Sequence, residues 1–566
     1  MKLPNLKQPH YSLHGTRWQR LLIAVIFLAT IYSTRFPFHI FHQSTISPKP
    51  HQGPLRHLLI PASQPDPNLC KTILSSTLLH YPIPTIINWG QTFNNQSLAN
   101  GGSHIAKLQG LYSHLAALGP DKDDELVLVV DGYDVWFQLD AQLLVERYHA
   151  VNARADARLT QEIGAENMRN LSAQQSVVFS SQKRCWPGSP ADTQCYAVPP
   201  SPLPTDLYGA DTDQDIDDGS ERYLYARYRP RYLNSGVVMG NVGAMRSMFE
   251  RAVAVQREGE KEGEIVESDQ GVFSLIWGMQ EFQRRVIGEQ WEMEKEEEGL
   301  GGWREWKGRF VGKEGVESEM MGAPTGVLGK HPTHKKPRLW DDMNYEFGIG
   351  LDYWSELGQA TVFANHDMEW VRFADKERLQ ESWERKNVSN PGGEELADDI
   401  KARLRPFAIL NEGVGLVNYT EEQSKEGGRK EPGGGKVWIA GGKKMKEVTP
   451  QTAGWDDVKL FTNLWTGVTP VMIHHNAHHG GLKQNRESMW GAIWFQRSAR
   501  VLLRKILQQG KMEGEERIAK EYGQKNLVLK TDKKGTPWVG WNDLCDAEMQ
   551  EEVFRDGKGV EKFRGD

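Results

Sequence analysis

The chain has 566 residues, of which 39% are hydrophobic and 25% are charged, and its formal net charge is -7. This length supports one large core with appendages, because single hydrophobic cores rarely grow beyond about 250–300 residues. The weakly acidic balance gives no broad attraction to nucleic acid, so a polyanionic partner is disfavoured. Only four cysteines occur, without a CxxC pair for structural zinc, although Cys185 and Cys195 can close a small loop in an oxidising compartment.

The amino-terminal segment carries the features of a signal anchor. Four Lys and Arg residues within 1–20 precede the apolar run LLIAVIFLATIY, which can extend through 21–38. Basic residues before an apolar run keep that end cytosolic, so we expect a single-pass type II protein of the ER or Golgi with a lumenal catalytic part. A cleaved signal peptide and a buried helix are the alternatives. Four Asn-x-Ser/Thr sequons follow on the expected lumenal side, at Asn95, Asn170, Asn387 and Asn418.

Composition divides the rest of the chain. Residues 39–67 are rich in Pro, His, Ser and Gln without an apolar period, which is typical of a stem. The folded domain is expected at 68–490, with a C-terminal extension at 491–566. Charged, Gly-rich stretches near 283–337 and 421–447 are expected to be surface insertions, because they lack the apolar residues that build a core.

Between the insertions, short β-branched runs alternate with helical periods, as in an α/β sheet. The run 126–130 (LVLVV) is apolar throughout, as expected of a strand covered on both faces, and a helix is expected before it at 108–118. Further strands are expected at 176–180 and 237–239. Asn241 can cap a helix with a core-facing stripe. That stripe consists of Met245, Met248, Phe249, Ala252 and Val253.

Two carboxylates follow the apolar strand directly, in the segment Asp131-Gly132-Tyr133-Asp134. Ligands of open α/β sheets collect beyond the carboxyl ends of the strands. Carboxylate oxygens suit Mg²⁺ or Mn²⁺, which also binds a diphosphate. The alternative is that both aspartates only form the turn, for which Asp-Gly is ordinary material.

Four histidines lie close together in the run PVMIHHNAHHGGL: His474, His475, His478 and His479. Imidazole can complete a Mn²⁺ site, and the alternatives are a zinc site or a solvated loop. Side chains alternate along a strand, so His474 and His475 are expected to point to opposite faces and only one of them to bind the ion. We expect that one to be His474.

Five short motifs follow one another along 83–483. They are Asp131-Gly-Tyr-Asp134, Arg231-Tyr-Leu-Asn-Ser-Gly236, Ser268-Asp-Gln270, Leu351-Asp-Tyr353 followed by Gln359, and Val471-Met-Ile-His-His-Asn476. In this order they resemble the glycosyltransferase domain of procollagen lysyl hydroxylases and related collagen glycosyltransferases. The sequence contains no His-x-Asp triplet that would begin the iron site of the oxygenase half.

The resemblance implies roles for the residues at the centre of these motifs. Asp131, Asp134 and His474 would bind Mn²⁺, Tyr133 would stack on uridine, and Lys107 would contact the diphosphate. In the family, two aspartates and a later histidine at the matching motif positions bind Mn²⁺. The resemblance also suggests that the anomeric configuration of the donor sugar is retained.

The resemblance places a second group of residues around the donor. Asn234, Ser235 and Gly236 would line the donor pocket, Asp269 would lie beside the sugar and acceptor as the catalytic candidate, and Asn476 would lie on the same face as the metal-binding histidine. The chain departs from the family at Ser268, where relatives carry an acidic residue, and in Ala-His-His-Gly after Asn476. These departures concern the donor sugar and the catalytic detail.

These features together predict a GT-A-like α/β fold, with a mixed sheet flanked by helices and an N-terminal membrane anchor. The expected reaction is transfer of a hexose from a UDP-sugar to a hydroxyl of a glycan or glycoprotein acceptor, with Mn²⁺ or another divalent cation as cofactor. A catalytically silent glycan-binding or scaffold protein of the same fold is the alternative. A zinc hydrolase built on the histidines ranks below it, because no Asp or Glu lies within that cluster.

Overall fold

The computed structural model describes most of the chain from residue 54 to residue 561. The described ranges are 54–215, 225–261, 268–299, 339, 344–389, 391–410, 437–438, 447–448, 453–477, 481–509, 527–533, 535 and 537–561. The expected cytosolic tail and signal anchor, and most of the insertion near 421–447, lie outside these residues. None of the helices within the described ranges is both long enough and apolar enough to cross a membrane. The chain from Gly53 onward clusters as one compact unit.

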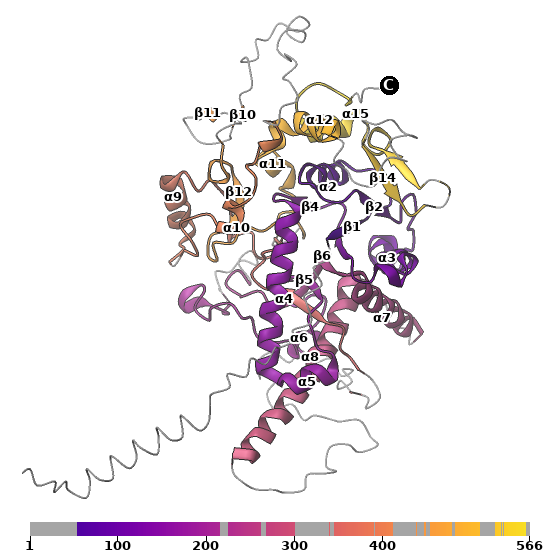
Figure 1. Cartoon of the computed structure of the whole chain (residues 1–566), viewed down its shortest axis with the longest axis vertical. Coiled ribbons are helices and arrows are strands. Elements are labelled where there is room, and N and C mark those ends of the chain that lie inside the picture. The colour runs from indigo at the N-terminus through magenta and orange to yellow at the C-terminus, as the bar shows by residue number, and fades with distance from the viewer. Residues whose placement is uncertain are drawn as a thin grey trace, which may run out of the picture. The chain divides into compact units, whose positions relative to one another are not determined.

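A mixed eight-stranded sheet forms the centre of this unit (Figure 1), in the order β15-β14-β2-β1-β3-β6-β5-β7. The strands are β1 (Leu55–Pro61), β2 (Pro84–Ile87), β3 (Leu126–Val130), β5 (Val177–Gln182), β6 (Tyr232–Asn241), β7 (Ile349–Asp352), β14 (Val528–Thr531) and β15 (Trp538–Gly540). Strand β1 runs parallel to β2 and β3, whereas β6 runs antiparallel to both β3 and β5. The fold is therefore a mixed α/β fold, as predicted.

The remaining strands form three smaller sheets. In one, β13 (Met472–His474) lies between β4 (Val135–Phe137), to which it is antiparallel, and β8 (Gly358–Ala360), to which it is parallel. This sheet joins the chain directly after β3 to the histidine run. The other two are the antiparallel pairs β9 (Met368–Val371) with β12 (Leu460–Asn463), and β10 (Val437–Trp438) with β11 (Glu447–Val448).

Helices flank the central sheet (Figure 1). They are α2 (Pro67–Leu78), α3 (Ser103–Leu118), α4 (Ala141–Ile163), α5 (Ala165–Leu171), α6 (Thr193–Tyr196), α7 (Val242–Lys261), α8 (Asp269–Gly299), α9 (Lys376–Lys386), α10 (Asp398–Lys401), α11 (Arg486–Trp490), α12 (Ala499–Gln509), α14 (Trp541–Leu544) and α15 (Ala547–Phe554). Helix α3 packs on β1 and β2, α7 on β3 and β6, and α8 on β6 and β7. On the C-terminal side, α12 and α15 pack against α2.

The local predictions around β3 are confirmed. Strand β3 covers 126–130, and all five of its residues are buried. The expected strands at 176–180 and 237–239 lie in or overlap β5 and β6, and the helix at 108–118 is the latter part of α3. Asn241 caps α7, since its Oδ1 accepts a hydrogen bond from the backbone N–H of Ala244 at 2.7 Å. The whole predicted stripe of α7 is buried.

Two predicted boundaries are wrong. Residues 55–61 were expected to belong to the stem, but they form β1 in the middle of the central sheet. Leu58, Leu59 and Ile60 are fully buried there, because this short apolar run outweighs the Pro- and His-rich composition around it. Likewise, the insertion expected from residue 283 begins as ordered helix, since α8 continues to Gly299 and the Arg284 guanidinium is buried against Glu281 and Glu346.

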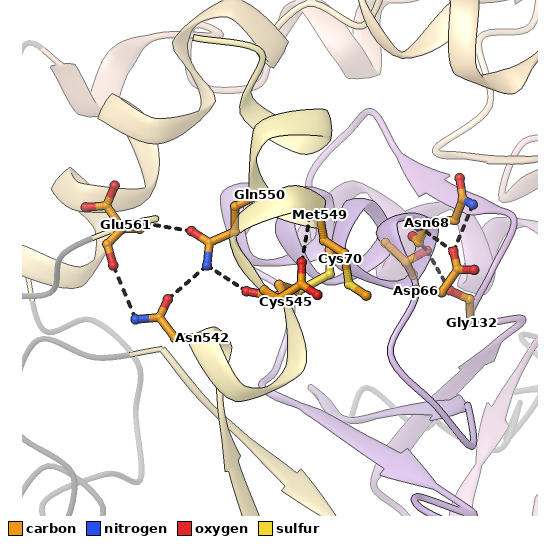
Figure 2. The surroundings of a disulfide bond; sticks show 11 residues. Asp66, Asn68, Cys70, Gly132, Asn542, Cys545, Met549, Gln550 and Glu561 are labelled. Carbon is orange, nitrogen blue, oxygen red and sulfur yellow. Dashed lines mark hydrogen bonds between the residues drawn. A yellow bond between two sulfur atoms is a disulfide. The ribbon is translucent and has the colours of Figure 1, made fainter. Parts of the chain in front are cut away.

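The segment expected to be a C-terminal extension is part of the same fold. Strands β14 and β15 extend the central sheet, and Cys545, after α14, forms a disulfide with Cys70 of α2 (Figure 2). Beside it, the buried Lys71 ammonium lies 2.6 Å from Glu487 and 2.5 Å from Glu552. The two ends of the described chain thus hold one another in place.

The Cys70–Cys545 disulfide should contribute much of the stability of this arrangement. The bond joins residues 475 apart in sequence, so its loss frees a very long loop in the unfolded chain. Replacing both cysteines with serine should lower the free energy of unfolding by about 2–5 kcal/mol, measured by denaturant titration. The control is the same double replacement at Cys185 and Cys195, only 10 residues apart, which should cost less. An equal or larger loss in that control would contradict the prediction.

Candidate metal centre

The turn between β3 and β4 holds the two aspartates in a fixed geometry. The backbone N–H of Asp131 donates to Gly236 O at 2.9 Å. Thr72 of α2 places its hydroxyl oxygen 3.0 Å from Gly132 O and 2.8 Å from Val135 O. Residue 132 must be glycine because the end of β1 lies too close for a side chain. A Cβ at this position would lie 2.8 Å from Pro61 O. The turn is therefore clamped between β1, β6 and α2.

The ring of His474, at the end of β13, points at these carboxylates. Its Nε2 lies 3.4 Å from Asp134 Oδ1 and 3.6 Å from Asp131 Oδ2. Its Nδ1 lies 3.0 Å from Asn234 Oδ1. The Asn234 amide nitrogen donates to Gln182 Oε1 and Gln270 Oε1, which fixes the orientation of the amide. An amide oxygen can only accept, so Nδ1 carries a proton, and Nε2 is the ring nitrogen that faces the carboxylates and could bind an ion.

Gly236 makes room for this ring. It lies in β6 with ordinary extended geometry, so its backbone does not require glycine. A Cβ added here would lie 2.6 Å from Nε2 of His474 and closer still to Cε1, well inside van der Waals contact. Any larger residue would push the imidazole away from the two aspartates.

Asp131, Asp134 and His474 together could hold a metal ion. One ligand atom from each lies within 4.8 Å of the other two. Bonds of about 2.1 Å to a shared ion place neighbouring ligand atoms roughly 3–3.6 Å apart, which matches the separations of Nε2 from the carboxylates. Among the described residues, the buried Asp134 Oδ1 is an oxygen without a hydrogen-bond partner. Two carboxylates and one imidazole suit Mn²⁺ or a similar divalent cation.

Two lysines flank the carboxylates. Lys107 Nζ lies 2.5 Å from Asp131 Oδ1 and 3.7 Å from Asp269 Oδ2, and Lys483 Nζ lies 3.1 Å from Asp134 Oδ2. Burial opposes the charge of Asp134, but His474 and Lys483 outweigh it and hold the pKa of this carboxyl well below its usual value. Burial likewise opposes the charge of Lys107, but Asp131 and Asp269 raise its pKa. The Lys107 ammonium therefore stays charged beside the ligand set.

The structure brings Asp269 to this centre as well. Asp269 is the first residue of α8, is buried, and shares the Lys107 ammonium with Asp131. Its neighbour Gln270 accepts hydrogen bonds from the Asn234 amide and from the Ser235 backbone N–H. The start of α8 is thus tied to the same strand that supports His474.

Other predicted site residues have supporting contacts. The Tyr133 hydroxyl lies 3.0 Å from the backbone N–H of Ser63, which holds the ring against the loop after β1. Asn476 Oδ1 accepts a hydrogen bond from Val362 N at 3.0 Å, so this oxygen is used within the fold and not at the metal centre. Asn234 holds the histidine, and Gly236 makes space for it.

His475 points to the opposite side of β13. Its ring packs on Trp136 at 4.1 Å between centroids, and within the described part of the chain neither ring nitrogen has a hydrogen-bond partner. Burial lowers the pKa of His475 to about 3. This residue belongs to the core, whereas His478 and His479 lie outside the described residues.

Sequence reasoning did not single out Lys483 or Gln270 as side chains that act at this centre. Lys483 follows a Gly-rich segment with no local pattern, and only its approach to Asp134 gives it meaning. Gln270 was part of a motif, but its contacts with residues 234 and 235 depend on how α8 packs on β6.

No protein-family model matches the chain, and no curated protein matches it at a significant level. The likeness to collagen glycosyltransferases therefore remains a resemblance of motifs. The grouping of Asp131, Asp134 and His474 is independent of it, because it follows from side-chain positions.

Replacing Gly236 with alanine should disrupt the metal centre while leaving β6 intact. The added methyl group displaces the His474 imidazole, so affinity for Mn²⁺ should fall about 10- to 100-fold by titration calorimetry. Gly393→Ala is the matched control, because a Cβ there has its nearest contact at 3.6 Å. Unchanged Mn²⁺ affinity in the Gly236 variant would contradict the role assigned to this glycine.

The buried His475 should make stability depend on pH. An unfolded histidine binds a proton near pH 6.5, whereas the folded pKa is about 3. The unfolded chain therefore takes up a proton that the folded chain does not, and the free energy of unfolding falls as pH drops below about 6.5. Between pH 7 and pH 4, this proton uptake should lower the free energy of unfolding of the wild type by about 3 kcal/mol. His475→Phe cannot bind the proton, so its free energy of unfolding should fall by about 3 kcal/mol less over the same range, measured by denaturant titration. Identical pH slopes in both proteins would refute the prediction.

Proposed function

We propose that the chain is a metal-dependent glycosyltransferase that transfers a hexose from a UDP-sugar to a hydroxyl of a glycan or glycoprotein. The observation that carries the proposal is the buried Asp131, Asp134 and His474 group at the carboxyl ends of β3 and β13, flanked by Lys107 and Lys483. A GT-A-like fold is part of the proposal. Its support is the mixed sheet and a site directly after a buried strand.

The charges of the site suit a nucleoside diphosphate. A divalent ion held by the two aspartates and His474 would supply positive charge to the diphosphate that leaves the sugar. Lys107 and Lys483 place two further positive charges at the edge of the same ligand set. Each lysine pairs with a carboxylate that would bind the ion. When the ion binds that carboxylate, the lysine can turn toward phosphate oxygens. We propose that Asp269, next to Lys107, lies beside the donor sugar.

The proposed compartment is the lumen of the ER or Golgi, with residues 21–38 as a membrane anchor. Two disulfides, Cys70–Cys545 and Cys185–Cys195, support an oxidising environment. The sequon residues Asn95, Asn170 and Asn387 are exposed, as acceptors of N-glycans must be.

The test is release of UDP from a panel of UDP-sugars with Mn²⁺ present. The wild-type chain should turn over at least one donor, and chelation should stop the reaction. Asp131→Ala and Asp134→Ala should each lower the rate at least about 100-fold, since each removes a metal ligand. Both changes lie in a turn, so circular dichroism should show a preserved fold.

Asp121→Ala serves as the matched control, because this exposed aspartate precedes β3, whereas Asp131 and Asp134 follow the opposite end of that strand. It should keep wild-type turnover and metal dependence. No UDP release with any donor, despite measured Mn²⁺ binding, would instead favour the catalytically silent scaffold. Full activity in either ligand variant under chelation would refute the metal assignment.

A further inference from the structure

Three aromatic rings and one guanidinium group form a patch on the segments after β5 and β8. The Tyr225 ring centroid lies 5.2 Å from that of Phe363 and 5.3 Å from that of Tyr228. The Arg184 Cζ lies 5.2 Å from the Tyr225 ring centroid. The three rings are half-buried and Arg184 is exposed, so the rings keep part of their surface in solvent. We call Arg184, Tyr225, Tyr228 and Phe363 the aromatic patch.

Two residues of the aromatic patch have a backbone conformation that bulky side chains avoid. Tyr225 has φ of 63° and Phe363 has φ of 57°, both in the left-handed region. Such a conformation costs roughly 1–2 kcal/mol per residue and persists only where the surroundings enforce it. Two contacting aromatic residues with this strain point to a ligand site, because strained residues cluster where ligands bind.

A buried ion pair holds the strained segments together. The Lys183 ammonium, almost fully buried, donates to Ala226 O at 2.6 Å and lies 2.6 Å from Asp367 Oδ2. Ala226 follows Tyr225, and Asp367 lies four residues after Phe363. One cation therefore fixes both sides of the patch, so the two rings are pre-positioned before any ligand arrives.

The patch is connected to the metal centre on the side of Phe363. The Thr361 N–H donates to the carbonyl oxygen of His474 at 3.0 Å, and the Val362 N–H donates to Asn476 Oδ1 at 3.0 Å. Phe363 is the next residue along. The segment that carries this ring is therefore bound directly to the strand end that carries the metal-binding histidine.

A second, independent connection runs through Arg184. Gln182 Nε2 donates to the carbonyl oxygen of Arg184 at 2.7 Å. Gln182 Oε1 accepts from the Asn234 amide at 2.9 Å, and Asn234 Oδ1 holds the His474 ring. Hydrogen bonds thus reach His474 from both sides of the aromatic patch, which links the patch to the support of the metal centre.

We propose that the aromatic patch is an acceptor subsite that binds the pyranose ring of a saccharide. Half-exposed aromatic faces can cover the C–H face of a pyranose, and an exposed guanidinium can donate to its hydroxyl groups. The acceptor is then a sugar hydroxyl and not the side chain of an unglycosylated polypeptide. This inference rests on the proposed function for the reaction, but binding of the sugar can be measured without turnover.

The test uses the full chain and methyl glycosides of glucose, galactose and mannose as probes. Tyr225→Gly and Phe363→Gly remove the rings while glycine adopts the same positive φ without strain, so the fold should be kept. Saturation-transfer NMR should show binding of at least one glycoside to the wild type. Each variant should weaken this binding about tenfold. With an accepted UDP-sugar, the ratio of transfer to donor hydrolysis should fall by a similar factor.

Trp538→Ala is the matched control. This half-buried ring also carries a cation, since Lys530 Nζ lies 5.8 Å from its centroid, but it lies in β15 at the opposite edge of the sheet from β5. It should keep wild-type glycoside binding.

The outcomes separate the two proposals. Glycoside binding that depends on Tyr225 and Phe363, without turnover of any donor, would support the subsite and refute the transferase. Transfer to peptide hydroxyls that neither variant weakens, or glycoside binding equal in wild type and both variants, would overturn the subsite and leave the transferase intact. No binding of any glycoside to the wild type would also overturn the subsite.

Discussion

The imidazole of His474, on β13, lies directly against Gly236, on β6. Glycine has only a hydrogen atom in place of a side chain, so the ring fits there. A Cβ at residue 236 would overlap the ring. The candidate metal centre depends on this contact, because the His474 ring lies against Gly236 in the position from which Nε2 faces Asp131 and Asp134. Asn234, two residues earlier on the same strand, accepts the Nδ1 proton of His474 and so leaves Nε2 facing the carboxylates.

Support for the aspartates comes from both ends of the chain. Helix α2 provides Thr72, which contacts the carbonyl groups of the Asp131–Asp134 turn, and the same helix is joined to the C-terminal region by the Cys70–Cys545 disulfide. The C-terminal strands complete the central sheet beyond β2. A region that was expected to be a separate C-terminal extension therefore helps to hold the candidate metal ligands in place, which a precise coordination geometry requires.

Charge balance explains why so many ionisable groups can meet in a buried place. The carboxylates of Asp131, Asp134 and Asp269 face the ammonium groups of Lys107 and Lys483, so each carboxylate has a positive charge beside it. The aromatic patch, which hydrogen bonds connect to His474, contains a single charged side chain, Arg184. An anionic donor and a neutral sugar acceptor would thus meet chemically different surfaces.

The sequence by itself determined the elements whose signal is local: the buried strand 126–130, the capped helix after Asn241, the carboxylates behind the strand, and the opposite orientations of His474 and His475. Each follows from periodicity or from turn chemistry within a few residues. Only the tertiary structure decided that residues 55–61 form a central strand, that Cys70 meets Cys545, that Lys483 reaches Asp134 and that Gln270 reaches Asn234. Those contacts join segments far apart in the chain, and their energies depend on packing between elements, which no local pattern encodes.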